Sequence, residues 1–535
     1  MKKTETLFIG AGLAVIIGVA GAHWMMSRAK TSAGASYAVA ETKFGNYLAA
    51  QHAVYVNDFD RAAKLTEILT AADPIVVQNT KMLAEFLSGH MPQNADALGA
   101  ENGTTARMIY DTSLITHEKW DELYKRHKGN KSAIMAPLRI WATVAAGHPK
   151  EAIKFVNQLA TNDSWKAFVR GQIYMETGDL VAATAEFDQV QADFMNINDY
   201  LYLMTFYQAH DMADAVDALR TDFTSRAGSL YIQHYTPDTP WDAYAGIQNQ
   251  LVFSLIQNVS HTTALMYTDM ALMMLRMAEV IRGGADDTLN YYLGQYFYTN
   301  QGNCPRYFDL ISGDSPLRPF AELRMADKSD DMASLARTVA AHPLFVPGAM
   351  RLIAHYVHRG NYRAAMRIAD RALADKGLND MGRAFFLKSR AQINMTFNKL
   401  SAAQKDVKAA ADIVPMDADI LSIQAKIWAA EKRELDTAYE YAMSLVRQNT
   451  ADVNAWDTLG RVVAVRDGVD VALDLLKRVG EVSSTCSSLF EQLGDMNVQV
   501  KDWDAARAAY TRAIELSTDG LTVRPTLEKK LRKLK

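Results

Sequence analysis

The chain has 535 residues, of which 49% are hydrophobic and only 13 are proline, and its formal net charge is −4. This length exceeds what one compact core holds, so it predicts several domains or a stack of small helical units. The nearly balanced charge argues against general binding of nucleic acid, because that binding needs a strongly positive surface.

The N-terminal segment, residues 1–27, is dominated by an apolar run at residues 7–26 that contains no charged residue. Lys2 and Lys3 precede the run, and Arg28 and Lys30 follow it. A helix of about 20 residues is about 30 Å long, which matches the hydrocarbon core of a bilayer. The sequence therefore predicts a single transmembrane signal anchor, followed by a linker at residues 28–42.

This anchor predicts a single-pass protein of the inner (cytoplasmic) membrane. The segment before the run is short and the body after it is large, so we expect the body in the periplasm. Ala20-Gly21-Ala22 has the small-x-small form that signal peptidase accepts, so cleavage to a soluble periplasmic protein is the alternative.

Residues 43–230 carry a weak repeat of helix pairs. Its best unit contains Gly171, Gly178, Ala183 and Phe187, in an order that recurs later in the chain. Small residues at fixed places let paired helices approach closely, as in proteins built of stacked helix pairs. We interpret this range as degenerate N-terminal repeats.

Residues 231–344 interrupt the repeat and are predicted to be an irregular helical segment. Pro237 and Pro240 break any helix there, and residues 304–319 contain three more prolines and a turn around Gly313. The two cysteines, Cys304 and Cys486, form no CxxC or histidine-paired motif, so we expect two buried cysteines, although a disulfide stays possible.

Residues 345–516 repeat regularly. Gly460 and Gly494 are 34 residues apart, and so are Ala472 and Ala506. Two independent positions that share one period make an accidental pattern improbable. The basic tail, residues 517–535, is predicted to be a helix that caps the last unit, with binding to a membrane surface as the alternative.

These units resemble the tetratricopeptide repeat superfamily over residues 43–516. The resemblance implies an all-α, right-handed superhelical solenoid of helix pairs. The N-terminal signal, the FGNYLAAQHA opening, the last unit WDAARAAYTRAIEL and the LEKKL tail are also similar to a group of proteobacterial, mainly alphaproteobacterial, envelope repeat proteins, whose role is generally undefined.

Members of the superfamily bind peptides or helices in a concave groove lined by the first helix of each pair. The resemblance therefore implies protein or peptide partners for this chain, and no cofactor. In this register the candidate groove positions are Trp165, Phe168, Gln172, Lys388, Gln392, Asp457, Arg461, Glu491 and Asp495.

Catalytic and metal motifs are missing from the sequence. No GxSxG, HExxH, GxxxxGK[ST], CxxC or GxGxxG run occurs, so we predict neither an enzyme nor a metal site. His355 and His358 are three residues apart but have no third ligand nearby. Three methionines in the run ALMMLRM have the helical spacing of core residues. They are Met273, Met274 and Met277.

The leading hypothesis is a membrane-anchored scaffold that organises a bacterial cell-envelope complex through protein–protein interactions. A second hypothesis places an enzyme-accessory or catalytic site in the irregular middle segment. A third is a homo-oligomer in which repeats of one chain bind those of another. A pocket with convergent ionisable residues in the middle segment would favour the second hypothesis.

Overall fold

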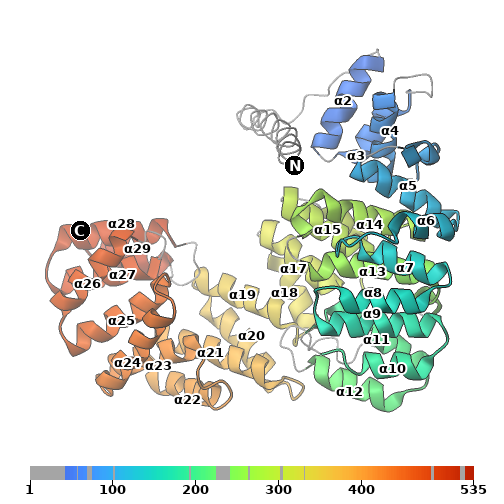
Figure 1. Ribbon diagram of the computed structural model, residues 1–535. Helices are drawn as coiled ribbons and strands as arrows, with labels where there is room; N and C mark the ends of the chain where they lie inside the picture. Colours follow the sequence, from blue (N-terminus) through green and yellow to red (C-terminus); the bar gives the residue numbers. More distant parts are fainter. Residues whose placement is uncertain are drawn as a thin grey trace, which may run out of the picture. The chain divides into compact units, whose positions relative to one another are not determined.

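The computed structural model describes residues 43–56, 58–68, 75–100, 103–191, 194–224, 241–262, 265–301, 305–329, 332–482, 487–517 and 524–534. Regular structure in these ranges is helical, with no strand (Figure 1), which confirms the predicted all-α class. None of the helices within these ranges is long and apolar enough to cross a membrane. The predicted anchor at residues 7–26 lies outside them, as do Cys304 and Cys486.

The chain forms two compact units, Met1–Ile109 and Tyr110–Lys535, a division that falls inside the range 43–230 treated above as one block. The described part of the first unit contains α2 (Lys43–Tyr55), α3 (Phe59–Thr66), α4 (Ile75–Leu87), a 3-10 turn (Ala95–Ala100) and the start of α5 (Thr104–Thr116). One core cluster in this unit consists mostly of alanines from the first three helices: Ala50, Ala53, Ala62, Leu65 and Ala84.

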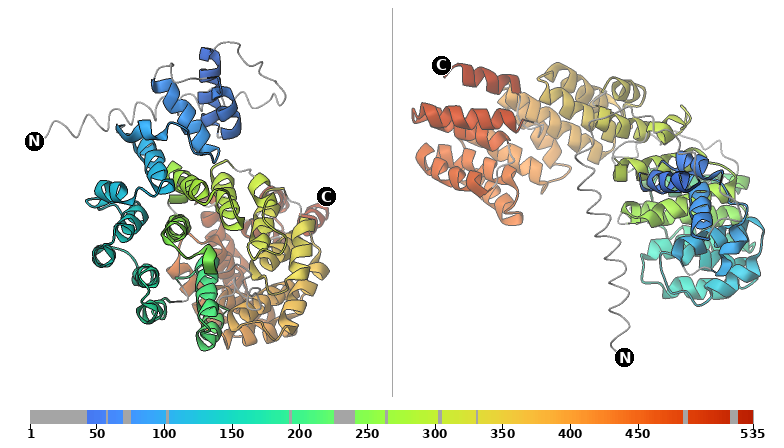
Figure 2. Two further views of the ribbon diagram at one scale, coloured as in Figure 1. Left: turned by 90° about the vertical axis from the view of Figure 1, so that its right-hand side faces the viewer. Right: turned by 90° about the horizontal axis from the view of Figure 1, so that it is seen from above.

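The second unit is a succession of helix pairs. Those before residue 225 are α6 (Trp120–His127), α7 (Ala136–Ala145) with α8 (Pro149–Gln158), α9 (Asp163–Glu176) with α10 (Leu180–Phe187), and α11 (Ile197–Ala209) with α12 (Ala213–Thr224). Figure 2 shows this stacking of successive helices from two further directions.

The middle segment is also largely helical. It contains a short turn at Trp241–Ala243, α13 (Ile247–His261), a turn at Leu265–Tyr267, α14 (Asp269–Arg282), α15 (Asp287–Gln301), α16 (Pro305–Asp309), α17 (Arg318–Ser329) and α18 (Met332–Ala341). Gly294 of α15 packs under Phe308 of α16, so the pairing of helices continues through part of this segment.

The regular array consists of five pairs and a final helix. These are α19 (Val346–His358) with α20 (Tyr362–Ala374), α21 (Asp380–Thr396) with α22 (Leu400–Ala411), α23 (Ala418–Glu431) with α24 (Leu435–Gln448), α25 (Val453–Arg466) with α26 (Val469–Val482), α27 (Ser487–Gln499) with α28 (Trp503–Glu515), and α29 (Arg524–Arg532).

Within a pair, the turn between helices is set by local chemistry. Gly178 follows α9 with φ 81°, a left-handed conformation that side chains disfavour. Asp179 then accepts a hydrogen bond from the amide of Ala182 at 3.0 Å and caps α10. Gly360 and Asn361 repeat this turn between α19 and α20, with φ 71° at the glycine.

Glycines in the first helices let the second helices pack closely. A Cβ on Gly171 would lie 2.5 Å from Cε1 of Phe187, and one on Gly460 would lie 2.5 Å from Cδ1 of Leu476. The partner is 16 residues further along in both pairs. The predicted small-residue positions of the second helices are all fully buried: Ala183, Ala365, Ala403, Ala438, Ala472 and Ala506.

Candidate functional site

Helix α13 lies across the first helices of the N-terminal pairs. The indole Nε1 of Trp141 in α7 donates to Oγ of Ser254 at 2.8 Å. At the start of α13, Gln248 donates to the carbonyl oxygen of Ile115 in α5 at 3.2 Å. Both contacts join residues more than 100 positions apart, so α13 returns to the beginning of the second unit.

Gln250 of α13 is the centre of a buried amide network. Gln172 in α9 donates to Oε1 of Gln250 at 2.9 Å, and Nε2 of Gln250 donates to the phenol oxygen of Tyr202 in α11 at 2.9 Å. All three side chains are fully buried, and burial raises the pKa of the Tyr202 phenol. The face of α5, α7, α9 and α11 where a ligand is expected is therefore occupied by the chain's own helix.

Of the three groove candidates in the N-terminal array, two are buried against α13. Phe168 is fully buried and stacks on Phe253 of α13, with ring centroids 5.7 Å apart and planes 5° apart. Gln172 is buried in the amide network described above. Trp165 is half-buried and lines a pocket at the end of α13. Phe168 and Gln172 thus contact an internal helix rather than solvent.

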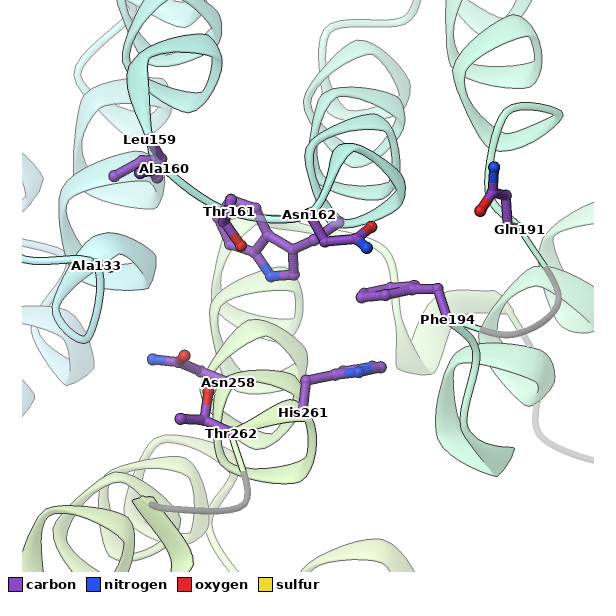
Figure 3. Close-up of a pocket in the computed structure, with 11 residues that line it drawn as sticks. Ala133, Leu159, Ala160, Thr161, Asn162, Gln191, Phe194, Asn258, His261 and Thr262 are labelled. Atoms are coloured by element: carbon purple, nitrogen blue, oxygen red, sulfur yellow. The ribbon is translucent and has the colours of Figure 1, made fainter. Parts of the chain in front are cut away.

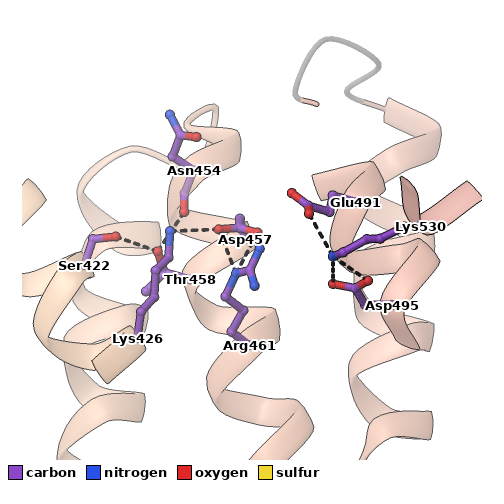
Figure 4. Close-up of polar contacts among 9 residues, drawn as sticks. All are labelled: Ser422, Lys426, Asn454, Asp457, Thr458, Arg461, Glu491, Asp495 and Lys530. Atoms are coloured by element: carbon purple, nitrogen blue, oxygen red, sulfur yellow. Dashed lines mark hydrogen bonds and ion pairs between the residues drawn. The ribbon is translucent and has the colours of Figure 1, made fainter. Parts of the chain in front are cut away.

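In the C-terminal array, the corresponding face of the first helices carries several charged side chains (Figure 4). Asp457 in α25 is fully buried, and its carboxylate lies 2.8 Å from Nζ of Lys426 and 3.1 Å from Nη2 of Arg461. Burial by itself raises the pKa of Asp457, but the charges of Arg461 and Lys426 outweigh this effect and hold it well below its usual range.

A second charged cluster lies one repeat further along (Figure 4). Nζ of Lys530 in α29 is 2.8 Å from Oε1 of Glu491 and 2.7 Å from Oδ2 of Asp495, both in α27. Burial lowers the pKa of Lys530, but the two carboxylates raise it above its usual value. The tail therefore neutralises the acidic pair predicted for the groove.

The other predicted pair, Lys388 and Gln392, lies on α21, two first helices before α25. Lys388 forms ion pairs with Asp417 and Asp419, each at 3.0 Å, and Gln392 is exposed. Between α21 and α25, α23 contributes Ser422 and Lys426. Sequence reasoning missed these two, although they precede Asp457 and Arg461 by one repeat length of 35 residues.

A pocket of about 450 Å³ lies at the C-terminal end of α13 (Figure 3). Nε2 of His261 is 2.5 Å from Oδ2 of the fully buried Asp199, and the ring of His261 stacks on Phe194 with centroids 4.2 Å apart. Among the lining residues that the structure describes, His261 alone is ionisable. They are Ala133, Leu159, Ala160, Thr161, Asn162, Trp165, Gln191, Phe194, Asn258, His261 and Thr262.

The hypothesis of a catalytic middle segment requires a pocket with convergent ionisable residues, so the lining of this pocket tests it. Acid–base or nucleophilic catalysis needs two or more groups that converge on one reacting atom. Here the only ionisable lining side chain is already paired with Asp199. In the described chain no group of three histidine, cysteine, aspartate or glutamate side chains is placed to hold a metal.

Two residue sets from the sequence analysis can be placed in the same way. Met273, Met274 and Met277 of α14 are buried in the core, as predicted. The ring of His355 contacts Tyr356, with centroids 5.6 Å apart. The side chain of His358 lies outside the described residues.

No protein-family model matches this sequence, and no curated protein matches it either. Solved structures that are similar include a tetratricopeptide repeat protein from Parabacteroides merdae, with 11% identity over 46% of this chain and 91% of that chain and a TM-score of 0.33.

Two other similar structures cover most of both chains. Cut9 in the APC/C Cut9–Hcn1 hetero-tetramer has 12% identity, coverage of 93% and 97%, and a TM-score of 0.33. Yeast Tom70 has 12% identity, coverage of 92% and 95%, and a TM-score of 0.24. These similarities carry no inference about a partner.

Proposed function

We propose that this protein is a scaffold that binds a segment of another protein along the first-helix face of α21, α23, α25 and α27. The contrast between its two arrays supports this proposal. The corresponding face of the N-terminal array holds α13, so this chain already contains a helix bound across its own first helices. In the described part of the C-terminal array, the only helix beyond the regular pairs is α29, at its end.

The charges on this face favour a polar partner segment. Lys388, Arg461 and Asp495 keep part of their side chains exposed, with relative side-chain exposures of 15%, 36% and 35%. Each is held by an ion pair and is therefore fixed in position before a partner arrives. Fixed charges select partners by orientation and sign more than they add raw affinity.

Site-specific photocrosslinking in living cells tests this proposal. A photoreactive amino acid replaces Gln392, which is exposed on the candidate face, and a matched control replaces Asp474, which is exposed on second helix α26. We expect a defined protein adduct at position 392 and none at position 474. Equal adducts at both positions would contradict the proposal, and an adduct only to a second copy of this chain would indicate self-assembly instead.

We also propose that residues 7–26 anchor the chain in the inner membrane, with the body in the periplasm as part of an envelope complex. The uncharged apolar run between positive flanks supports this. Carbonate extraction of membranes and protease digestion of spheroplasts test it. Release of the chain by carbonate would point to the cleaved, soluble alternative, and protection of the body in spheroplasts would contradict the orientation.

A further inference from the structure

A second hollow lies between the second helices α18 and α20, over the first helix α19. Its volume is about 510 Å³, within the range of roughly 300–1,000 Å³ found for ligand pockets. These three helices are neighbours in Figure 1. The lining residues are Ala336, Val339, Ala340, Pro343, Leu352, Tyr356, Ala364, Arg367, Ile368, Arg371 and Ala372.

The floor of this hollow is apolar. Val339, Leu352, Ala364 and Ala372 are its buried lining residues. Tyr356 and Ile368 are half-buried at its walls. A concave apolar surface gains free energy when a matching apolar ridge removes it from water. The hollow therefore favours an occupant with an apolar face.

The rim of the hollow is basic. Arg367 and Arg371 line it and are exposed, and no carboxylate occurs among the described lining residues. Nη2 of Arg371 donates to the carbonyl oxygen of Ala340 at 3.0 Å, which holds this guanidinium across the hollow. Arg363, one turn earlier on α20, and Arg337 on α18 are also exposed and add positive charge nearby.

We infer that this hollow is a docking site for an acidic amphipathic helix of a partner protein. Arg367 and Arg371 are four residues apart on one helix, which separates them by about 6 Å along the axis. Carboxylates four residues apart on a partner helix have the same spacing. Such a helix would place an apolar stripe on the floor and its carboxylates on the two arginines, the mode by which grooves bind amphipathic helices.

The geometry favours a helix over an anionic lipid surface. The apolar floor lies below the arginines, so a flat bilayer would meet the guanidinium groups without reaching Leu352. The ridge of a helix enters a hollow of this kind. The site is formed mainly by second helices, so it is separate from the first-helix face proposed above.

Fluorescence anisotropy with the full chain tests the inference. The probe is a synthetic, end-capped helical peptide with glutamates at i and i+4 beside a leucine stripe. In the charge-reversed control peptide, lysine replaces each glutamate. We expect the acidic peptide to bind the wild-type chain and to bind the Arg367→Glu, Arg371→Glu double variant about tenfold more weakly. The double variant should instead prefer the lysine peptide.

A matched control makes the same charge change elsewhere. The Lys477→Glu, Arg478→Glu variant alters two exposed residues of α26 and should bind the acidic peptide as the wild type does. A third variant, Ala336→Trp, fills the hollow while keeping both arginines, and it should also weaken binding.

Several results would overturn the inference. One is equal binding of the acidic peptide by the wild type and by the Arg367→Glu, Arg371→Glu variant, called the rim variant. The others are an equal loss of peptide binding in the α26 control and unchanged peptide binding by Ala336→Trp. Binding of phosphatidylserine vesicles in place of the peptide, lost in the rim variant, would assign the site to lipid. A concentration-dependent rise in mass that the rim variant abolishes would assign it to a second copy of the chain.

Discussion

Nζ of Lys426 in α23 lies 2.8 Å from Oδ2 of Asp457 in α25, and this contact joins two successive first helices through a fully buried carboxylate. Arg461, one turn along α25, approaches the other carboxylate oxygen at 3.1 Å. Two cations thus compensate one buried anion. Removing the anion leaves both cations without this buried counterion.

We expect Asp457→Asn to lower the free energy of opening of α25 by about 3 kcal/mol at neutral pH, because it breaks a buried ion pair. The folded pKa of Asp457 is lowered, so its ionised form stabilises the fold fully above the unfolded value of about 4. That contribution is lost as the pH falls through the folded pKa. The difference between wild type and variant should therefore shrink below about pH 4.

Native-state hydrogen exchange of the α25 amides at several pH values measures this difference. Asp467→Asn, an exposed change at the end of the same helix, is the control and should have little effect at any pH. A difference that grows as the pH falls would contradict the assigned charge state.

Gln250→Ala should loosen the N-terminal array. The substitution removes the hydrogen bonds that Gln172 and Tyr202 make with Gln250, at a cost of about 1–3 kcal/mol for a buried group left unsatisfied. Hydrogen exchange should accelerate in α9 and α11 and stay unchanged in α25. Asn249→Ala, which removes only hydrogen bonds to nearby carbonyls, is the control. Unchanged exchange in α9 would show that α13 is not an integral part of the array.

Leu527→Ala should destabilise the end of the chain. Leu527 of α29 is fully buried against Tyr510 and Ala513 of α28, so its truncation removes packing worth about 2–5 kcal/mol. Protection should fall in α27–α29, since only the terminal unit depends on this contact. Lys529→Ala, an exposed change on the same helix, is the control. If both variants behaved alike, α29 would not act as a cap.

The register of the repeats could be predicted from sequence because it rests on local steric rules. Gly171 and Gly460 lie where a large residue of the second helix packs against the first helix, and a side chain there would collide with it. Because each repeat needs a small residue at this place, small residues recur in the sequence with a fixed period. The right-handed sense of the superhelix stays a prediction.

The position of α13 could not be predicted in the same way. Its contacts with Ile115 and Trp141 join residues more than 100 positions apart, and no period links them. One signal was available, because residues 247–260 contain no charged side chain, and a helix exposed to solvent usually carries several. The hollow beside Arg367 and Arg371 likewise depends on how neighbouring pairs stack.

Gly460 and Gly494 occupy equivalent places in the last two pairs, where each first helix meets its second helix. A Cβ at Gly460 would lie 2.5 Å from Cδ1 of the fully buried Leu476, and a Cβ at Gly494 would collide with the ring of Tyr510. Both neighbours are buried side chains. A larger side chain at either glycine must therefore push the paired helices apart.

We expect Gly460→Leu to cost about 1–3 kcal/mol through overpacking and to uncouple the terminal units. In a stack where each repeat contacts only its neighbours, the damage stays local, so amides after about Asp452 should lose hydrogen-exchange protection while those of α7–α12 keep theirs. Asp467→Leu, at an exposed position of the same pair, should change little. Intact protection of α25–α28 would mean that the helices of this pair do not cross at Gly460, and an even loss along the whole chain would mean that the repeats do not unfold as a nearest-neighbour stack.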